Sequence, residues 1–240
     1  LLFQDNRRAR SRCAALLEAA ERLTMSERSG MFVSFEGLEG VGKSTSIQMA
    51  ADWLQARGIG FISTREPGGT PVAERIRDIA LGHHDEQLTD ASELLLMFAA
   101  RSQNVENVIR PALARGDWVL CDRFTDTTLA YQGYARGFAL DAIYRLADLV
   151  HGDMWPARTL LLQAEPAIIR ERLADRGSPL DRIEQQGDAF FARAGAGYAA
   201  LAEAHADRYR VIDTGGTLND MVMQIDQVMA EAFAAHHQHS

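Results

Sequence analysis

The chain has 240 residues, which suits one domain, and its 47% apolar and 24% charged residues are typical of globular proteins. Its formal net charge of −8 argues against broad, non-specific binding to nucleic acid. No apolar run approaches the roughly 18 residues that a membrane-spanning helix needs, and two cysteines form neither a disulfide framework nor a zinc pattern. We therefore expect a cytoplasmic protein with no membrane or nucleic-acid partner, and with Cys121 as a buried core thiol.

The first 30 residues precede the first predicted strand and carry several arginines. Their apolar stretches are too short for a signal peptide, although the spacing over 13–23 allows a short helix. We treat residues 1–30 as an N-terminal extension and residues 31–240 as the main domain.

Apolar runs that are typical of buried strands alternate with segments of helical spacing in the rest of the chain. The predicted elements, in chain order, are a strand over 31–37, a helix over 44–57, a strand over 59–64, a helix over 70–82, a long helical stretch over 90–115 bent at Pro111, a strand over 118–122, helices over 126–131 and 140–150, a strand over 158–164, helices over 166–174 and 187–205, a strand over 209–213 and a helix over 217–235. This alternation predicts an α/β fold with a mostly parallel sheet flanked by helices.

The segment "DRGSPLDRIEQQG", residues 175–187, interrupts this regular alternation. It contains two arginines and three acidic residues, and glycines lie near both ends. An exposed surface loop would have this composition. The glycines also suit the hinges of a mobile lid, which is the second interpretation.

The stretch "FEGLEGVGKST", residues 35–45, lies between a predicted strand and a predicted helix. Gly37, Gly42, Lys43 and Ser44 match the pattern GxxxxGK[ST]. Glycines in such a loop allow backbone N–H groups to point inward and surround phosphate oxygens, and the helix N-terminus adds a partial positive charge. The motif therefore predicts a binding site for a nucleoside triphosphate.

Lys43 is the only lysine in the chain, and the remaining basic residues among the 25 are all arginines. An ammonium is a compact point charge that can reach the β- and γ-phosphates, whereas the wider, planar guanidinium does not fit the same loop. Ser44 offers a hydroxyl to Mg²⁺. Asp122 ends the third predicted strand, where a parallel sheet presents its ligands, and is the second predicted metal residue, acting through water.

The glycine loop alone does not distinguish a kinase from a GTPase or a motor. A regulatory GTPase needs an NKxD motif, which a chain with a single lysine in its glycine loop cannot contain. A transporter-type ATPase would have an LSGGQ-like segment, which the sequence lacks.

Several further segments indicate a second, anionic substrate. They are "TREPGGT" (64–70), "FAARSQ" (98–103), "CDRF" (121–124) and "AYQG" (130–133). Each has an ordinary structural explanation, such as a turn, a surface salt bridge or a core aromatic. Together they bring arginines and aromatic residues to one crevice at the ends of the strands.

These segments resemble those of bacterial thymidylate kinases. "FEGLEGVGKST", "TREPGGT", "LLLMFAARSQ", "DRFTDTTLAYQG" and "LDRIEQ" occur in the family's order and spacing, and the resemblance runs from about residue 31 to about residue 232. It implies a P-loop NTPase fold with a five-stranded sheet and a lid at about 175–187. It also implies transfer of the γ-phosphoryl of ATP to dTMP with Mg²⁺ as cofactor, and a homodimer.

The resemblance assigns residues to both nucleotides by matching position. The implied ATP-binding residues are Gly37, Leu38, Glu39, Gly40, Val41, Gly42, Lys43, Ser44 and Thr45. The implied dTMP-binding residues are Glu39, Arg65, Phe98, Arg101, Arg123, Thr128 and Tyr131. The implied catalytic residues are Lys43, Arg123, Arg176 and Arg182.

Roles within the dTMP site follow from the same resemblance. Arg123 and Arg65 would hold the phosphate of dTMP. Thymine would receive hydrogen bonds from Arg101 and pack on Phe98, with Thr128 at its edge.

Two residues would surround the sugar. Tyr131 would crowd the 2′ position and so favour deoxyribose, and Glu39 would contact the 3′-hydroxyl or organise the phosphate site. Because the glycine loop has no arginine, Arg176 and Arg182 of the lid would supply the charge for the transition state.

Two alternatives remain at this point. The chain could be another P-loop kinase that acts on a different nucleotide or small metabolite. It could also be an ATP-dependent binding module without an acceptor, which would leave the acceptor-side arginines without a purpose.

Overall fold

The computed structural model describes residues 30–175, 177 and 181–238. Except for Gly30, the predicted N-terminal extension lies outside this part of the chain. The elements, in chain order, are β1 (Phe32–Glu36), α2 (Lys43–Gln55), β2 (Phe61–Arg65), α3 (Pro71–Leu81), α4 (Asp90–Asn104), the π-helical segment η1 (Val105–Ile109), α5 (Arg110–Ala114), β3 (Trp118–Asp122), α6 (Thr125–Thr128), the π-helical segment η2 (Leu129–Ala135), α7 (Leu140–His151), β4 (Arg158–Gln163), α8 (Pro166–Asp175), α9 (Asp188–Ala204), β5 (Tyr209–Asp213) and α10 (Leu218–Gln238).

The five strands form one sheet in the order β2-β3-β1-β4-β5, and every neighbouring pair is parallel. The predicted α/β fold with five strands is therefore confirmed. Strand β3 lies between β1 and β2, so that Asp122 is opposite both Phe35 and Arg65. The carboxyl ends of these three strands thus meet at one edge, where open α/β sheets bind their ligands.

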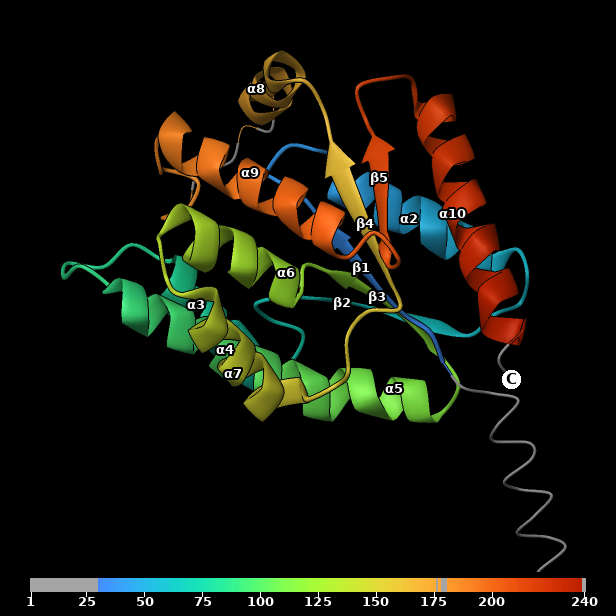
Figure 1. Cartoon of the computed structure of the whole chain (residues 1–240), viewed down its shortest axis with the longest axis horizontal. Helices are drawn as coiled ribbons and strands as arrows, with labels where there is room; N and C mark the ends of the chain where they lie inside the picture. Colours follow the sequence, from blue (N-terminus) through green and yellow to red (C-terminus); the bar gives the residue numbers. More distant parts are fainter. Residues whose placement is uncertain (1–29, 176, 178–180, 239–240) are drawn as a thin grey trace, which may run out of the picture.

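Apolar side chains cover both faces of the sheet, as the continuous apolar runs of the strands predict. On one face, alternate residues such as Phe35, Leu120 and Leu160 pack with α2 and α10. On the other face, Cys121 packs with η1 and α5, while Leu161 packs with α4, α7 and α9. The result is a three-layer arrangement, with the sheet between two layers of helices (Figure 1). The prediction that Cys121 is buried in the core is confirmed.

The long predicted helical stretch over 90–115 differs from the structure at its centre. The structure has α4, then η1, then α5, in place of one helix bent at Pro111. Proline cannot donate the amide hydrogen bond that a continuous α-helix needs, and the wider π turn lies immediately before it. The amide of Arg110 accordingly donates to the carbonyl of Val105, five residues earlier.

The helix predicted over 126–131 also differs, because it continues as η2 to Ala135. The amide of Arg136 donates to the carbonyl of Tyr131 at 3.0 Å, again five residues earlier. Gly133 allows close packing here, since a β-carbon on it would lie 2.5 Å from Cδ2 of Leu140. The π turns rotate the residues of this segment relative to a regular helix, a feature that is frequent at functional sites.

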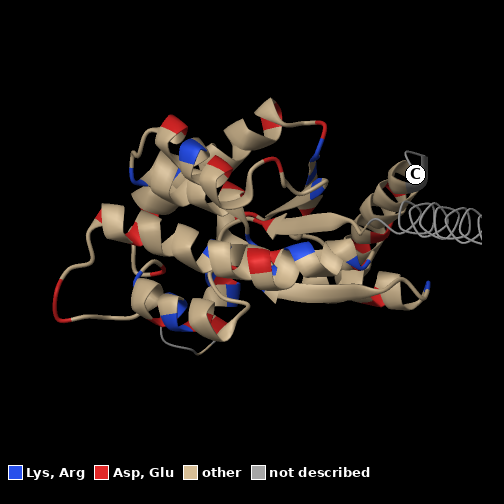
Figure 2. Ribbon diagram, turned by 90° about the horizontal axis from the view of Figure 1, so that it is seen from below, with Lys and Arg blue, Asp and Glu red and all other residues tan. Residues whose placement is uncertain are grey.

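Figure 2 shows acidic and basic residues interspersed along the helices on this side of the molecule. The excess of acidic residues is therefore spread over several elements in this view. Among the described residues, none of the helices combines the length and the apolar character that a membrane span requires.

Buried polar contacts hold the segment that follows β3. The hydroxyl of Thr125 lies 2.8 Å from Nε2 of the fully buried His151, whose ring packs 4.9 Å from the ring of Phe124. Arg208 donates two hydrogen bonds of 2.7 Å to Asp126. These contacts fix α6 immediately after the strand end that carries Asp122.

The buried His151 predicts that stability decreases in acid. Burial lowers the pKa of His151 to about 3, whereas an unfolded chain's histidine titrates near its ordinary value of 6.5. Between pH 7 and pH 5 the unfolded state therefore takes up a proton that the folded state does not, and the free energy of unfolding falls. We expect His151→Gln, which keeps an acceptor for Thr125 but does not titrate, to reduce this fall by about 2 kcal/mol.

Urea denaturation of both proteins at pH 7 and pH 5 measures this difference. Other titrating groups are common to the two proteins and cancel in the comparison. Equal losses of stability in the wild type and His151→Gln would contradict the assignment.

Candidate functional site

The loop between β1 and α2 has the conformation of a phosphate-binding loop. Gly37, Gly40 and Gly42 have φ values of 135°, 75° and 91°, which favour glycine. A β-carbon on Gly37 would lie 2.5 Å from the carbonyl oxygen of Leu162. Helix α2 begins directly after Gly42, so its unpaired N–H groups and partial positive charge face this loop. The loop can therefore hold an anion of the size of phosphate.

Lys43 begins α2 and turns its side chain back over the loop. Its ammonium donates hydrogen bonds to the carbonyl oxygens of Leu38, at 2.8 Å, and Gly37, at 3.2 Å. Burial, together with the nearby charge of Arg123, lowers the pKa of Lys43 to about 8. A bound polyphosphate would favour the charged ammonium, because it supplies negative charge to a cation that is largely out of water.

Ser44 and Asp122 are the predicted metal residues. Ser44 lies on the first turn of α2, and Asp122 ends β3. One carboxylate oxygen of Asp122, Oδ1, is buried and has no hydrogen-bond partner among the described residues. A buried acceptor without a partner fits the water shell of Mg²⁺, which is bound through few protein ligands and substrate phosphates.

Arg123 follows Asp122 in the left-handed region, with a φ of 68°. A non-glycine residue rarely adopts this conformation, and such residues occur often at functional sites. Its guanidinium donates to the carbonyl of Gly37 at 2.9 Å and forms an ion pair of 2.7 Å with Glu39. The backbone conformation therefore directs this side chain toward the glycine loop.

Glu39 joins the glycine loop to the residues after β3. One of its carboxylate oxygens accepts from Arg123, and the other accepts a 2.6 Å hydrogen bond from the hydroxyl of Tyr131 on η2. Burial raises the pKa of the Tyr131 hydroxyl well above its ordinary value, so it remains a donor. The structure thus brings together three residues that the sequence analysis selected from two distant segments.

Arg65 ends β2 on the opposite side of Asp122. Its side chain is about half exposed and forms a 2.9 Å ion pair with Glu74 on α3. Arg77, on the same helix, donates to the carbonyl of Pro67 at 2.8 Å. Burial lowers the pKa of the Arg77 guanidinium, and the charge of Arg65 adds to this effect. Both guanidiniums therefore lie at this edge of the sheet, and the sequence analysis selected only Arg65.

Arg101 on α4 is buried beneath this edge. Its Nε lies 2.6 Å from a carboxylate oxygen of the buried Glu66, and Nη2 donates to the carbonyl of Phe124 and the hydroxyl of Thr128. The guanidinium carbon lies 4.8 Å from the centre of the Phe98 ring. The remaining nitrogen, Nη1, is buried without a partner among the described residues. A planar ligand with carbonyl oxygens could supply the acceptor that this donor lacks among the described residues.

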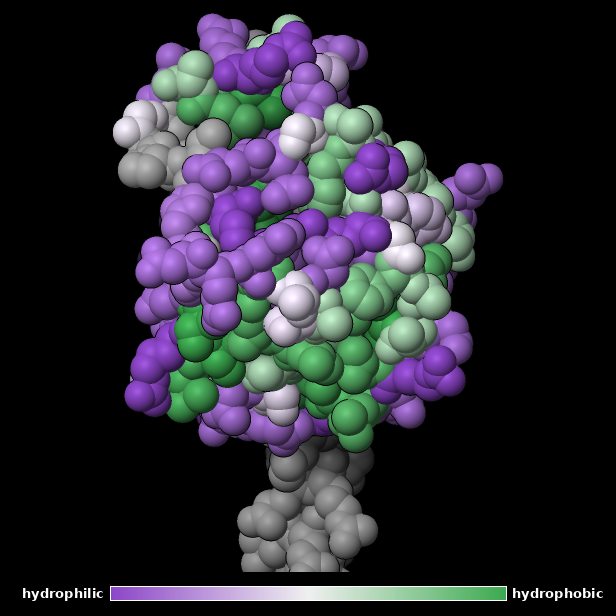
Figure 3. All heavy atoms as spheres, turned by 90° about the vertical axis from the view of Figure 1, so that its left-hand side faces the viewer, coloured by the Kyte–Doolittle hydropathy of each residue, from purple (hydrophilic) through white to green (hydrophobic). Residues whose placement is uncertain are grey.

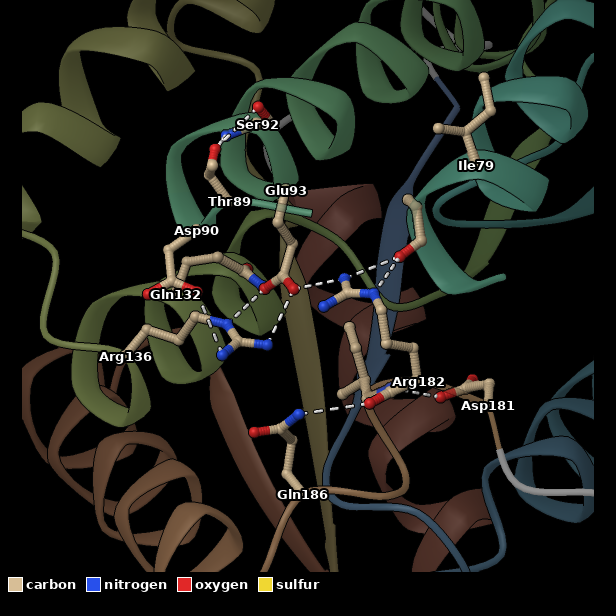
Figure 4. Close-up of polar contacts among 12 residues, drawn as sticks. Ile79, Thr89, Asp90, Ser92, Glu93, Gln132, Arg136, Asp181, Arg182 and Gln186 are labelled. Carbon is tan, nitrogen blue, oxygen red and sulfur yellow. Dashed lines mark hydrogen bonds and ion pairs between the residues drawn. The ribbon is translucent and has the colours of Figure 1, made fainter. Parts of the chain in front are cut away.

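Arg182 lies in the segment between α8 and α9, and its Nε and Nη2 already donate hydrogen bonds. The guanidinium donates to the carbonyl of Ala80 at 3.1 and 2.8 Å and forms an ion pair with Glu93 on α4. Glu93 also accepts hydrogen bonds from Arg136 and Gln132 (Figure 4). In this structure Arg182 therefore fastens the predicted lid to α3 and α4.

Burial opposes ionisation of Glu93, but the hydrogen bonds of its partners outweigh this effect and lower its pKa. Glu93 is therefore a charged carboxylate at the centre of a cluster of hydrogen-bond donors. Arg176, the other predicted lid arginine, lies outside the described residues.

A cavity of about 760 Å³ lies beside the glycine loop, between α8 and α9. Leu38 and Glu39 of the loop line it, together with apolar residues that include Ile169 and Leu173 of α8 and Phe191 of α9. On the face shown in Figure 3, polar side chains gather across the middle of the surface below the projecting top of the molecule. The cavity leaves space above Glu39 for part of a ligand.

Several residues of the site gave no usable signal in the sequence analysis. Glu66 and Thr127 occur in the selected segments but received no role. Tyr198 lies in an alanine-rich helix without a motif.

Arg172 on α8 also received no role. It donates to the carbonyl of Thr214, and a β-carbon built on Gly42 would lie 3.8 Å from Nη1 of Arg172. Arg172 thus adds a guanidinium near the glycine loop.

Comparisons with known proteins identify the family of this chain. A family model described as thymidylate kinase matches residues 35–225. The thymidylate kinase of Alkalilimnicola ehrlichii is 46% identical over 203 residues, which cover 85% of this chain and 94% of that protein. The thymidylate kinase of Pseudomonas syringae pv. tomato is 47% identical over 203 residues, covering 85% and 96%.

A solved structure is also similar. The crystal structure of thymidylate kinase from Ehrlichia chaffeensis has a TM-score of 0.68 and 30% identity, and the match covers 84% of this chain and 99% of that one. The parallel α/β fold agrees with this match, and the resemblance seen in the sequence is confirmed. The chain belongs to the thymidylate kinase family.

Proposed function

We propose that this protein transfers the γ-phosphoryl group of ATP to dTMP, giving ADP and dTDP. Membership of the thymidylate kinase family supports the reaction. The observation that carries it is the ion pair between Glu39 of the glycine loop and Arg123 of the strand end, because it joins a donor-phosphate site to an acceptor-phosphate site.

The glycine loop, Gly37 to Thr45, would hold the phosphates of ATP. Its backbone N–H groups would bind the phosphate oxygens, and Lys43 would follow the γ-phosphoryl group during transfer. Ser44 and Asp122 would hold Mg²⁺, which neutralises charge on the β- and γ-phosphates when it is bound. Oδ1 of Asp122, which has no partner within the described part of the chain, supports this assignment.

The acceptor phosphate would bind Arg123 and Arg65, which flank Asp122. Both guanidiniums are paired with carboxylates in this structure, Arg123 with Glu39 and Arg65 with Glu74. A phosphate dianion would compete for these donors with two or more charge-assisted hydrogen bonds each.

Thymine would lie against Phe98 and receive hydrogen bonds from Arg101. Nη1 of Arg101, which bonds to none of the residues that the structure describes, and the contact of Nη2 with Thr128 support this role. Tyr131 would crowd the 2′ position of the sugar, and Glu39, which Tyr131 binds, would lie near the 3′-hydroxyl.

The acceptor of this reaction is already an anion, so catalysis needs no strong general base. The difficulty is to bring two polyanions into line, and positioning with charge neutralisation is the means by which phosphoryl-transfer enzymes achieve it. Lys43 and Arg123 would neutralise charge on the two sides of the transferred group. Closure of the segment over 175–187 would exclude water and so limit hydrolysis of ATP.

Arg176 and Arg182 remain the proposed lid arginines of the transition state. Arg182 can take this role only after its bonds to Glu93 and Ala80 break, which favours Arg176. We also propose that the domain over 31–240 works as a homodimer in the cytoplasm, as the family resemblance implies.

The reaction is tested by incubating the purified chain with ATP and Mg²⁺ and adding dTMP, dUMP, dGMP or AMP. We expect release of ADP that depends on dTMP and exceeds that with the other acceptors. A preference for another acceptor would indicate a different nucleotide kinase, and ADP release without any acceptor dependence would indicate an ATPase or switch.

Replacement of the single lysine tests the donor site. We expect Lys43→Ala to lower kcat with dTMP by at least about 100-fold, because no ammonium then stabilises the negative charge of the phosphoryl group during transfer. Circular dichroism should show an intact fold. Arg145→Ala, which removes an exposed cation paired with Asp141 on α7, is the control and should keep wild-type turnover. Comparable kcat values for Lys43→Ala and the wild type would disprove the role.

Replacement of Arg101 tests recognition of the base. Arg101→Lys is preferable to alanine, because alanine would leave the carboxylate of Glu66 buried without a cation. The lysine cannot supply Nη1 and Nη2 together, so we expect the KM for dTMP to rise about tenfold or more, while the KM for ATP changes less than about twofold.

Steady-state kinetics with varied dTMP and varied ATP measure both constants. Arg145→Lys makes the same change at an exposed position and serves as the control. An unchanged KM for dTMP, with the same order of preference among acceptors, would show that Arg101 does not read the base.

A further inference from the structure

Tyr198 on α9 lies fully buried beneath Arg123, and the roles proposed above do not include it. We propose that Tyr198 is a positioning residue for the acceptor phosphate. Its hydroxyl, together with that of Thr127, bridges the buried carboxyl group of Glu36 and the guanidinium of Arg123. This inference rests on the proposed role of Arg123 in binding dTMP.

The bridge consists of polar contacts that join Arg123 to residues of β1, α6 and α9. Nη1 of Arg123 donates to the hydroxyl oxygens of Thr127, at 3.3 Å, and Tyr198, at 3.4 Å. The two hydroxyls lie 2.7 Å apart. Both reach the same carboxyl oxygen of Glu36, with Thr127 at 2.5 Å and Tyr198 at 3.1 Å. Each hydroxyl can accept from the guanidinium and donate onward, so every polar group has a partner.

Glu36, which accepts from both hydroxyls, is itself held in a fixed position. It ends β1, is fully buried, and accepts a 2.7 Å hydrogen bond from the amide of Phe124, next to Arg123. Burial and the neighbouring charge of Asp126 raise the pKa of Glu36 to about 8. A buried polar group that loses its hydrogen-bond partner costs more free energy than an exposed hydrogen bond contributes. The side chains of this network are therefore held in one arrangement.

The guanidinium of Arg123 needs such support because arginine has many rotamers. Fixing them when a phosphate binds would reduce affinity, since the lost side-chain entropy counts against binding. In this structure the guanidinium is held from two sides, by the glycine-loop carbonyl of Gly37 and by the two hydroxyls. Arg123 is therefore oriented before the acceptor arrives, which favours binding and in-line transfer.

The position of α9 makes this contact possible. A β-carbon on Gly197 would lie 2.7 Å from Cβ and Cγ of Tyr134, so a glycine at this position allows α9 to approach η2 closely. The neighbouring Tyr198 also packs edge-on against the ring of Tyr131, at 6.2 Å. Helix α9 follows the predicted lid directly, and Tyr198 thus connects the helix after the lid with the acceptor arginine.

Tyr198→Phe removes the hydroxyl and keeps the ring. We expect the dissociation constant for dTMP, measured by titration calorimetry, to rise about tenfold, as for loss of a hydrogen bond to a charged group. The KM for ATP should change less than about twofold. Tyr209→Phe is the matched control, because the buried hydroxyl of Tyr209 has no hydrogen-bond partner in the part of the chain that the structure describes. It should leave the affinity for dTMP unchanged.

Arg123→Lys provides the test of mechanism. If the hydroxyl acts through the guanidinium, adding Tyr198→Phe to Arg123→Lys should weaken dTMP binding less than about twofold further, as a double-mutant cycle measures. Three results would overturn the proposal: unchanged dTMP affinity in Tyr198→Phe, an undiminished effect in the Arg123→Lys background, or equal weakening of dTMP and ATP binding. A wild-type protein that does not bind dTMP would instead refute the proposed function, and this inference with it.

Discussion

The parallel pairing of β1 with β3 is the constraint on which the site depends. It sets Phe35 opposite Asp122, so that the glycine loop and Arg123 leave the sheet at the same level of adjacent strands. The amide of Arg123 still donates to the carbonyl of Phe35, at 3.0 Å, before the chain turns with a φ of 68°. The strand ladder thus holds the backbone up to Arg123, the carboxylate of Glu36 holds the next amide, and the unusual conformation directs the Arg123 side chain over the glycine loop.

Charges in the site are balanced by protein groups when no ligand is present. Arg123 is paired with Glu39, Arg65 with Glu74 and Arg101 with Glu66, while the ammonium of Lys43 rests on backbone carbonyls. Buried cations would otherwise be costly, and the lowered pKa of Lys43 reflects that cost. Phosphates can replace these partners, so the donors are oriented before substrates bind and little reorganisation is required.

The lid region is connected to the rest of the molecule at its far end. Arg182 is bound to Glu93 and Ala80, and the buried Ile183 packs with the cluster around α4 and α9. Movement of the whole segment through residue 187 would break these contacts.

The sequence by itself determined the strands, the glycine loop and the family, because these follow from local patterns: short apolar runs, glycines at required backbone conformations, and motifs of adjacent residues. Only the tertiary structure showed the π-helical segments at 105–109 and 129–135, the anchoring of Arg182 and the bridge through Tyr198. Tyr198 and Glu36 are separated by 162 positions, and Arg182 and Glu93 by 89. Such contacts depend on how helices pack on the sheet, which no local pattern encodes.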